Sequence, residues 1–252
     1  MTAVLRMSEV NVTFTSGWGR RRTRVRAMKD VTLEVPAGRT LAMVGESGSG
    51  KSTTGAVALG LRRPDSGTVE VLGKPVREHS SAERGRIQAV LQHPQWSLNP
   101  RRRVGVSVRE PLTVASADLS RQEQQDRVER ILEQVGLGAV TADRYPHELS
   151  GGQRQRVSVA RALITEPGFI VFDEAVSALD VSVQMHILAL IRELQAEHGF
   201  GALFISHDLG AVRQVADTVA VMSRGEVLET AATEDFFDNP THEYSRRLLG
   251  AL

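Results

Sequence analysis

The 252-residue sequence contains no cysteine. This excludes disulfides, thiolate metal sites and cysteine-ligated iron–sulfur clusters, and it fits a reducing compartment. No apolar run approaches the roughly 20 residues needed to span a bilayer. The N-terminus lacks the basic segment and long apolar stretch of a secretory signal, and a net charge of +1 gives no general reason to expect nucleic acid as a partner. We therefore expect a soluble, cytoplasmic chain whose membrane role, if any, comes through a partner.

What is present is an ordinary globular composition, with 41% apolar and 24% charged residues. Several short runs are continuously apolar, which suits central parallel strands covered by helices on both faces. Others alternate apolar with polar residues, which suits a strand with one face in water. The continuous runs are residues 41–44, 169–172, 202–205 and 219–222, and the alternating ones are residues 31–35 and 68–72. The spacing of the continuous runs leaves room for crossover helices, so the pattern predicts an α/β core.

The stretch near residues 106–165 has helical periodicity instead. Residues 122–135 are polar except for apolar residues at helical spacing. These are Val128, Ile131, Leu132 and Val135. The helix is predicted to end at Gly136 and a second helix to begin after Ser150. The stretch therefore indicates a helical subdomain inserted into the α/β core.

Residues 45–52 read Gly-Glu-Ser-Gly-Ser-Gly-Lys-Ser and match the phosphate-binding pattern G-x-x-x-x-G-K-[ST]. They follow an apolar run and precede residues 53–59, which can open a helix, so backbone N–H groups and the helix N-terminus can surround phosphates. Lys51 is expected to reach the β- and γ-phosphates of ATP, and the Ser52 hydroxyl to ligate Mg²⁺. The residues predicted to bind nucleotide here are Gly45, Glu46, Ser47, Gly48, Ser49, Gly50, Lys51, Ser52 and Thr53.

The apolar run 169–172 ends in two acids, Asp173 and Glu174. Both carboxylates should then lie at the C-terminal edge of the sheet, where α/β folds bind ligands. Asp173 is suited to the Mg²⁺ shell. Glu174 is suited to orient and deprotonate the water that attacks the γ-phosphate.

A third segment, residues 149–153, reads Leu-Ser-Gly-Gly-Gln. Ser150 is a good N-cap for the helix that follows. Two glycines just inside a helix cost about 1 kcal/mol each relative to alanine, so something should require their bare backbone. Close approach to a phosphate would supply that requirement.

These three motifs together resemble the nucleotide-binding subunit of an ABC transporter, over nearly the whole chain. The resemblance implies an α/β fold: a P-loop NTPase core of RecA-like type, with an antiparallel β subdomain and an inserted α-helical subdomain. It also implies that Ser150 and Gly152, flanked by Gly151 and Gln153, contact the γ-phosphate held by a second subunit's phosphate-binding loop. Two ATP molecules are then sandwiched in a head-to-tail dimer.

The same resemblance assigns further positions. Gln92 resembles the Q-loop glutamine that senses Mg²⁺ and the attacking water and links to the membrane subunit. Residues 177–180, which end at Asp180, resemble the D-loop that crosses the dimer interface. His207 resembles the switch histidine that holds the γ-phosphate.

The aromatic residue that stacks on adenine in this family corresponds to Phe14, at the end of the first strand. Trp18 is an alternative, because residues 16–26 resemble an insertion. This insertion carries Arg20, Arg21, Arg22, Arg24 and Arg26. A solvated loop or a docking surface is favoured over nucleic-acid binding, because no basic stripe with interleaved aromatics follows.

The resemblance implies a single ABC ATPase domain over residues 1–252. Residues 1–91 and 166–230 are expected to form the α/β core with the antiparallel part. Residues 92–165 would hold the Q-loop, the helical subdomain and the signature. Residues 231–252 would form a C-terminal extension.

Residues 93–101, 110–112 and 239–249 resemble ATPase subunits of oligopeptide and dipeptide importers. His93 replaces the usual Asp of that branch, Glu243 replaces the usual Pro, and the cysteine cluster of some relatives is absent. Nickel importers carry similar segments, so a nickel or other small-solute importer remains an alternative.

The implied role is an ATPase subunit that energises import at the cytoplasmic face of a membrane. Its implied partners are a second ATPase subunit, either a paralogue or a copy of itself, two permease subunits and, indirectly, a substrate-binding protein. The rivals are a soluble ABC ATPase that acts on nucleic acid or ribosomes, and an exporter subunit. Two nucleotide domains or a coiled coil would mark the former and a fused membrane domain the latter, and the sequence shows none of these.

Overall fold

The computed structural model describes residues 2–16, 23–80, 83, 85–92, 98–115 and 118–250. Several positions singled out above lie outside these residues. They are Trp18, Arg20, Arg21, Arg22 and residues 93–97.

A six-stranded sheet forms the centre of the molecule, with strand order β10-β9-β3-β8-β7-β6. All neighbours in it run parallel except β10, which pairs antiparallel with β9. The strands are β3 (Thr40–Val44), β6 (Ile87–Leu91), β7 (Phe169–Asp173), β8 (Gly201–Ile205), β9 (Thr218–Ser223) and β10 (Glu226–Ala232). All four continuously apolar runs of the sequence are therefore parallel strands of this sheet, as predicted.

Each central strand divides its side chains between two hydrophobic cores. In β7, Phe169 and Val171 belong to the core on one face, and Ile170 and Phe172 to the core on the other. Successive side chains of a strand point to opposite faces, so a strand buried on both faces needs apolar residues at every position. This double burial explains the continuous apolar runs.

A second sheet covers one face of the first. Its order is β2-β1-β4-β5, and all its pairs are antiparallel. The strands are β1 (Ala3–Ser16), β2 (Thr23–Pro36), β4 (Ser66–Val71) and β5 (Lys74–Pro75). Residues 31–35 lie within β2, which is longer than the predicted strand. Arg24 and Arg26 also lie in β2, paired with Thr15 and Thr13, so this part of the predicted insertion is antiparallel strand.

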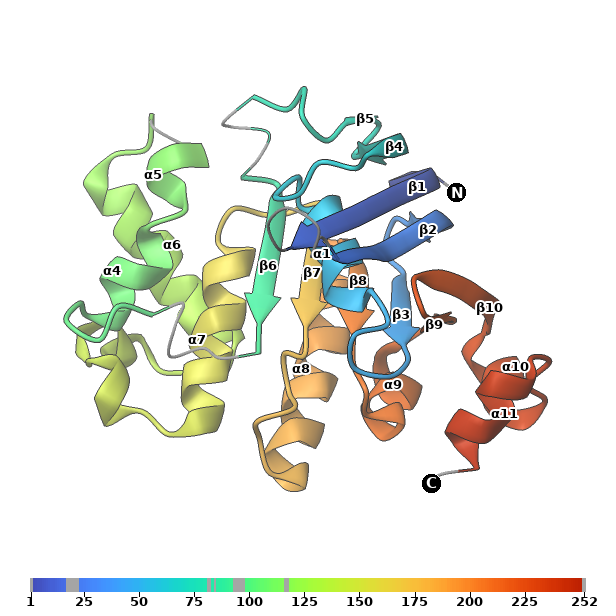
Figure 1. Cartoon of the computed structure of the whole chain (residues 1–252). Helices are drawn as coiled ribbons and strands as arrows, with labels where there is room; N and C mark the ends of the chain where they lie inside the picture. The colour runs from blue at the N-terminus through green and yellow to red at the C-terminus, as the bar shows by residue number, and fades with distance from the viewer. Residues whose placement is uncertain are drawn as a thin grey trace.

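Helices cover the opposite face and extend to one side, where α4 to α7 stand beside β6 (Figure 1). These helices are α4 (Val104–Arg109), α5 (Leu112–Ala115), α6 (Arg121–Gln134), α7 (Gly151–Leu163), α8 (Val181–His198) and α9 (Leu209–Val215), with short 3-10 turns η2 (Ala139–Asp143) and η3 (Pro146–Glu148). Helix α1 (Lys51–Ala58) instead packs on the face that the second sheet covers, because its Val57 and Ala58 belong to the core on that side. The helices predicted over 122–135 and after Ser150 are α6 and α7. Both begin with a capping box, Ser120 with Glu123 and Ser150 with Gln153.

Beyond β9 the chain forms β10 and two short helices, α10 (Thr233–Asp238) and α11 (Glu243–Leu249). They lie at the β10 edge of the large sheet, on the side away from α4 to α7 (Figure 1). The boundary expected at 230/231 falls inside β10. Among the described residues, none of the helices combines the length and apolarity that crossing a bilayer requires.

Phe172 offers a test of the core beneath the strand ends. Its ring is 1% exposed and lies 6.4 Å and 6.2 Å from those of Phe200 and Phe204. Phe172→Ala is expected to lower the free energy of unfolding by about 3–5 kcal/mol, because it leaves a cavity. Val114 is 62% exposed and provides the control. Val114→Ala should change the free energy of unfolding by no more than about 0.5 kcal/mol. Urea unfolding measures both, and equal losses would contradict this account of the core.

Candidate nucleotide-binding site

Four adjacent parallel strands end at one edge of the large sheet, and each leads into a predicted functional segment. β3 leads into residues 45–52, β8 into His207, β7 ends at Asp173, and β6 is followed by Gln92. The spatial order β3-β8-β7-β6 thus gathers residues that lie up to 162 positions apart in the sequence, from Gly45 to His207. The carboxyl edge of such a sheet is the usual place for a ligand.

The loop at residues 45–52 is held tightly against β9. Gly45 has a φ of 146°, and a Cβ on it would lie 2.0 Å from the carbonyl oxygen of Met222. Gly50, with a φ of 117°, ends the loop, and a Cβ there would lie 2.2 Å from the carbonyl oxygen of Ala27. Only glycine fits either position. Lys51 and Ser52 are the first residues of α1, two positions earlier than the predicted helix start.

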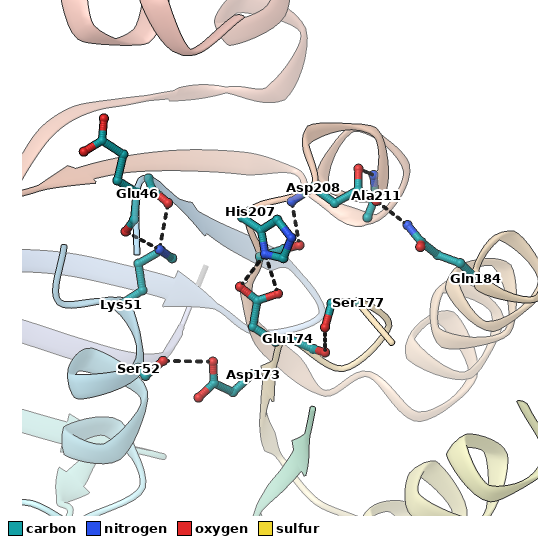
Figure 2. Close-up of polar contacts among 12 residues, drawn as sticks. Glu46, Lys51, Ser52, Asp173, Glu174, Ser177, Gln184, His207, Asp208 and Ala211 are labelled. Carbon is teal, nitrogen blue, oxygen red and sulfur yellow. Dashed lines mark hydrogen bonds and ion pairs between the residues drawn. The ribbon is translucent and has the colours of Figure 1, made fainter. Parts of the chain in front are cut away.

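Lys51 folds back over the loop. Its Nζ donates hydrogen bonds to the carbonyl oxygens of Gly45 and Glu46, at 2.7 Å and 2.8 Å (Figure 2). Burial lowers the pKa of Lys51, and the charges of Glu174, Asp173 and Glu46 partly oppose this shift. A cation in such a cradle is placed to exchange its carbonyl partners for phosphate oxygens.

Ser52 and Asp173 come together as the sequence predicts. The Ser52 hydroxyl lies 3.3 Å from Oδ1 of Asp173 (Figure 2). Burial raises the pKa of Asp173; the hydrogen bond from Ser52 and the charge of Lys51 oppose the shift, and the Glu174 charge adds to it. A hydroxyl and a carboxylate are hard oxygen donors of the type that Mg²⁺ prefers, so these residues fit a magnesium ion.

Glu174 and His207 form a pair at the same edge. Nδ1 of His207 lies 2.9 Å and 2.8 Å from the two carboxylate oxygens of Glu174 (Figure 2). Glu174 is 17% exposed, whereas the histidine ring is 65% exposed. Glu174 also has a φ of 52°, which a non-glycine residue adopts at a cost, and such residues cluster at functional sites. The bond from its N–H to the Ile205 carbonyl, 2.9 Å, helps to hold this conformation.

A cleft of about 810 Å³ opens over these residues. The predicted residues that line it are Phe14, Gly45, Glu46, Ser47, Gly48, Gly50, Lys51, Ser52, Thr53, Gln92, Glu174 and His207. Ser49 instead is buried beneath the loop, with its hydroxyl 3.5 Å from Lys51 Nζ. Phe14, the candidate adenine-stacking residue, is 42% exposed, and the guanidinium of Arg62 lies over its ring, 4.6 Å from the centroid.

The signature segment lies elsewhere. Of the described residues that line the cleft, none belongs to 150–153, and Asp180 is not among them. Ser150 caps α7, where its hydroxyl accepts a hydrogen bond from Gln153 N–H at 3.3 Å. A Cβ on Gly152 would lie 2.6 Å from Val183 of α8, so packing within the chain already requires this glycine. At Gly151 the nearest contact would be an ordinary 3.7 Å, to Leu179, and packing alone leaves that glycine unexplained.

Asp180 is exposed and precedes α8 without a side-chain capping bond. One turn later, Gln184 donates to the carboxylate of Asp208 at 2.5 Å, next to His207 (Figure 2). The first turn of α8 therefore touches both the signature helix, through Val183, and the loop that carries His207.

Sequence reasoning missed Arg62, Ala27 and Leu248, which contact Phe14 or line the cleft. It also missed Tyr244, whose hydroxyl accepts a hydrogen bond from the Glu46 N–H at 3.2 Å. No local pattern could find Leu248 and Tyr244, because the loop residues that they face lie about 200 positions earlier in the sequence. The resemblance of residues 239–249 to a transporter branch marked the segment, but not its contact with the loop.

The sequence matches the family described as ABC transporter over residues 28–177. An oligopeptide transport ATP-binding protein of Mycobacterium tuberculosis is 48% identical over 232 residues, which are 90% of this chain and 38% of that protein. A dipeptide transport ATP-binding protein of Haemophilus influenzae is 44% identical over 232 residues, 90% of this chain and 71% of that protein. Among solved structures, the dimeric post-hydrolysis state of the ATP-binding cassette MJ0796 bound to ADP and Pi has a TM-score of 0.77 and 28% identity, and covers 91% of this chain and 98% of that one.

Asp173→Asn tests the electrostatics of the site through stability alone. The raised pKa of Asp173 means that the folded protein holds its proton more readily than the unfolded chain does. Its contribution to stability therefore falls as pH rises through that pKa, and the ionised carboxylate is destabilising near neutral pH. The variant should melt at a higher temperature than the wild type at neutral pH. This difference in melting temperature should become smaller as the pH is lowered toward the ordinary Asp pKa of about 4. The exposed Asp118→Asn serves as control, and a lower melting temperature for Asp173→Asn at neutral pH would refute this.

Proposed function

This chain belongs to the ABC transporter family, and from that membership we propose that it is the ATP-hydrolysing subunit of a peptide importer. One observation carries the catalytic part of the proposal. A single cleft is lined by the phosphate-binding loop, Ser52, and the Glu174 and His207 pair, and Asp173 lies behind this lining, 3.3 Å from the Ser52 hydroxyl. These are the parts that hydrolysis of a nucleoside triphosphate needs: a cradle, a cation site and a group that activates water.

ATP binds with its phosphates in the loop at residues 45–52. Lys51 gives up its bonds to the Gly45 and Glu46 carbonyls and turns to the β- and γ-phosphates. Phe14 stacks on the adenine. Ser52 and Asp173, together with Gln92, would hold Mg²⁺, and the ion would supply positive charge beside the phosphates.

Glu174 orients the attacking water and accepts its proton. The water oxygen forms a bond to the γ-phosphorus as the bond to the leaving ADP oxygen breaks. His207 has its Nδ1 at the Glu174 carboxylate, so Nε2 is the ring nitrogen left to hold the γ-phosphate. Lys51 and His207 stabilise charge that develops in the transition state.

The signature segment serves a second subunit. Ser150, Gly151, Gly152 and Gln153 lie outside this chain's own cleft, which supports a head-to-tail dimer in which they complete the partner's ATP site. Asp180 lies at the interface between the two. The related MJ0796 cassette is described as dimeric. The partner is a paralogue or a second copy of this chain.

Closure of the dimer on two ATP and its opening after hydrolysis drive two permease subunits, which a substrate-binding protein supplies. The chain acts at the cytoplasmic face of the membrane. Peptide as cargo is supported by the names of the relatives, which transport oligopeptides and dipeptides, and by the segments 110–112 and 239–249.

The cargo is tested by purifying the chain with the proteins that accompany it, and by measuring ATP hydrolysis of that assembly in liposomes. Peptides of two to several residues, presented with the substrate-binding protein, should stimulate hydrolysis, and nickel ions should not. Stimulation by nickel alone would replace the peptide assignment. Nucleic acid in place of permease subunits would contradict transport altogether.

Glu174→Gln tests the catalytic assignment. The amide cannot accept the proton of water, so steady-state ATP hydrolysis should fall by about 100-fold or more, while affinity for ATP stays near that of the wild type. The exposed Glu193→Gln, on α8, makes the same chemical change away from the cleft and should leave hydrolysis unchanged. Near-normal hydrolysis by Glu174→Gln would remove the residue from the mechanism.

A further inference from the structure

The short helix α11 reaches the phosphate-binding loop from 198 residues away in the sequence. The hydroxyl of Tyr244 accepts a hydrogen bond from the backbone N–H of Glu46 at 3.2 Å. Leu248 lines the nucleotide cleft itself. Residues four apart share one face of a helix, so α11 turns a single face toward the loop and the cleft.

Glu46 is consequently held at both ends of its backbone. Its carbonyl oxygen accepts from Lys51 Nζ at 2.8 Å, and its N–H donates to Tyr244. When Lys51 turns to a phosphate, the first bond is given up. The bond to Tyr244 does not involve Lys51 and can persist, so it restrains the mouth of the loop while ATP is bound.

A buried carboxylate fixes the position of α11. Glu229, on β10, is 9% exposed. It accepts hydrogen bonds from the N–H and the hydroxyl of Thr241, both at 2.8 Å, and from the N–H of His242 at 3.0 Å. Burial alone would raise the pKa of Glu229, but the nearby Ser245 hydroxyl and the hydrogen bonds from Thr241 and His242 outweigh it and lower that pKa to about 2. The anchor therefore stays ionised at physiological pH, which strengthens its hydrogen bonds.

Side-chain packing holds the rest of the helix. Ser245 is fully buried, and Tyr244, Leu248 and Leu249 pack against the large core. An isolated helix of seven residues is not stable in water, so these contacts and Glu229 determine where Tyr244 lies. His242 adds a cap, because its Nδ1 accepts from the Tyr244 N–H at 3.0 Å.

We infer that the C-terminal helix is part of the ATP site: Tyr244 is a positioning residue for the phosphate-binding loop, and Leu248 forms a wall of the cleft. Glu229 anchors both. This inference rests on the proposed function, since it takes ATP as the occupant of the cleft.

The test is Tyr244→Phe in the full chain, which keeps the ring and removes the hydroxyl. Loss of one neutral hydrogen bond that restrains the loop should weaken MgATP binding by about three- to tenfold. In the assembled transporter, KM for ATP should rise by a similar factor, with kcat at saturating ATP unchanged. Tyr145→Phe is the matched control, because Tyr145 is the other of the chain's two tyrosines and lies beside η3, in the helical part. It should leave the Kd of ATP unchanged.

Two further variants strengthen the test. Glu229→Gln should also raise the Kd, and in combination with Tyr244→Phe it should add little, because both act through one contact. If Tyr244→Phe does not fold, Leu248→Ala tests the same helix by shortening the wall, and it should also raise the Kd.

The outcomes are distinct. An unchanged Kd in folded Tyr244→Phe, or a fall in melting temperature with no change in Kd, overturns the inference and leaves the proposed function standing. Equal losses in Tyr244→Phe and Tyr145→Phe overturn it as well. A wild-type chain that binds no ATP overturns the proposed function first.

Discussion

The site depends on one constraint, which is that β3, β8, β7 and β6 are adjacent and parallel and therefore end at the same edge of the sheet. Their order places the phosphate-binding loop, His207, the two acids and Gln92 side by side, although the chain visits them in a different order. The constraint is maintained by burial on both faces. Alternate side chains of each strand enter different cores, so a slip of one residue in register would exchange the two sets.

Within this frame the site holds charges and conformations that the fold disfavours. Burial raises the pKa of Asp173 and lowers that of Lys51, so each group is less readily ionised than it would be in water. Glu174 has a positive φ. The surrounding sheet must offset these costs, and the Phe172 and Phe204 rings near the strand ends supply part of that support. Such strain is expected where a protein must accept a charged substrate rather than fill the space itself.

The sequence predicts most of this frame because its signals are local. The apolar runs indicate buried strands, and the pattern of residues 45–52 dictates the loop, since glycine alone fits where Gly45 meets Met222. The acids at the end of β7 follow from strand direction. What the sequence does not reveal is long-range packing. Tyr244 and Leu248 look like ordinary residues of a short amphipathic helix, and only the position of β10 brings them to the loop. The true length of β2 was hidden in the same way, because its exposed arginines resembled a loop.

The contact between Gly45 and Met222 has a wider consequence. A backbone that meets a neighbouring backbone with no side chain between them has nothing to absorb a displacement. The loop and β9 must therefore shift together, and β10, paired with β9, shifts with them. Evolution then cannot alter the buried strand β9 without altering how the loop receives its ligand. Selection for nucleotide affinity thus extends to Met222, whose backbone meets the loop at Gly45 and whose side chain lies against Gly50, although Met222 does not line the cleft.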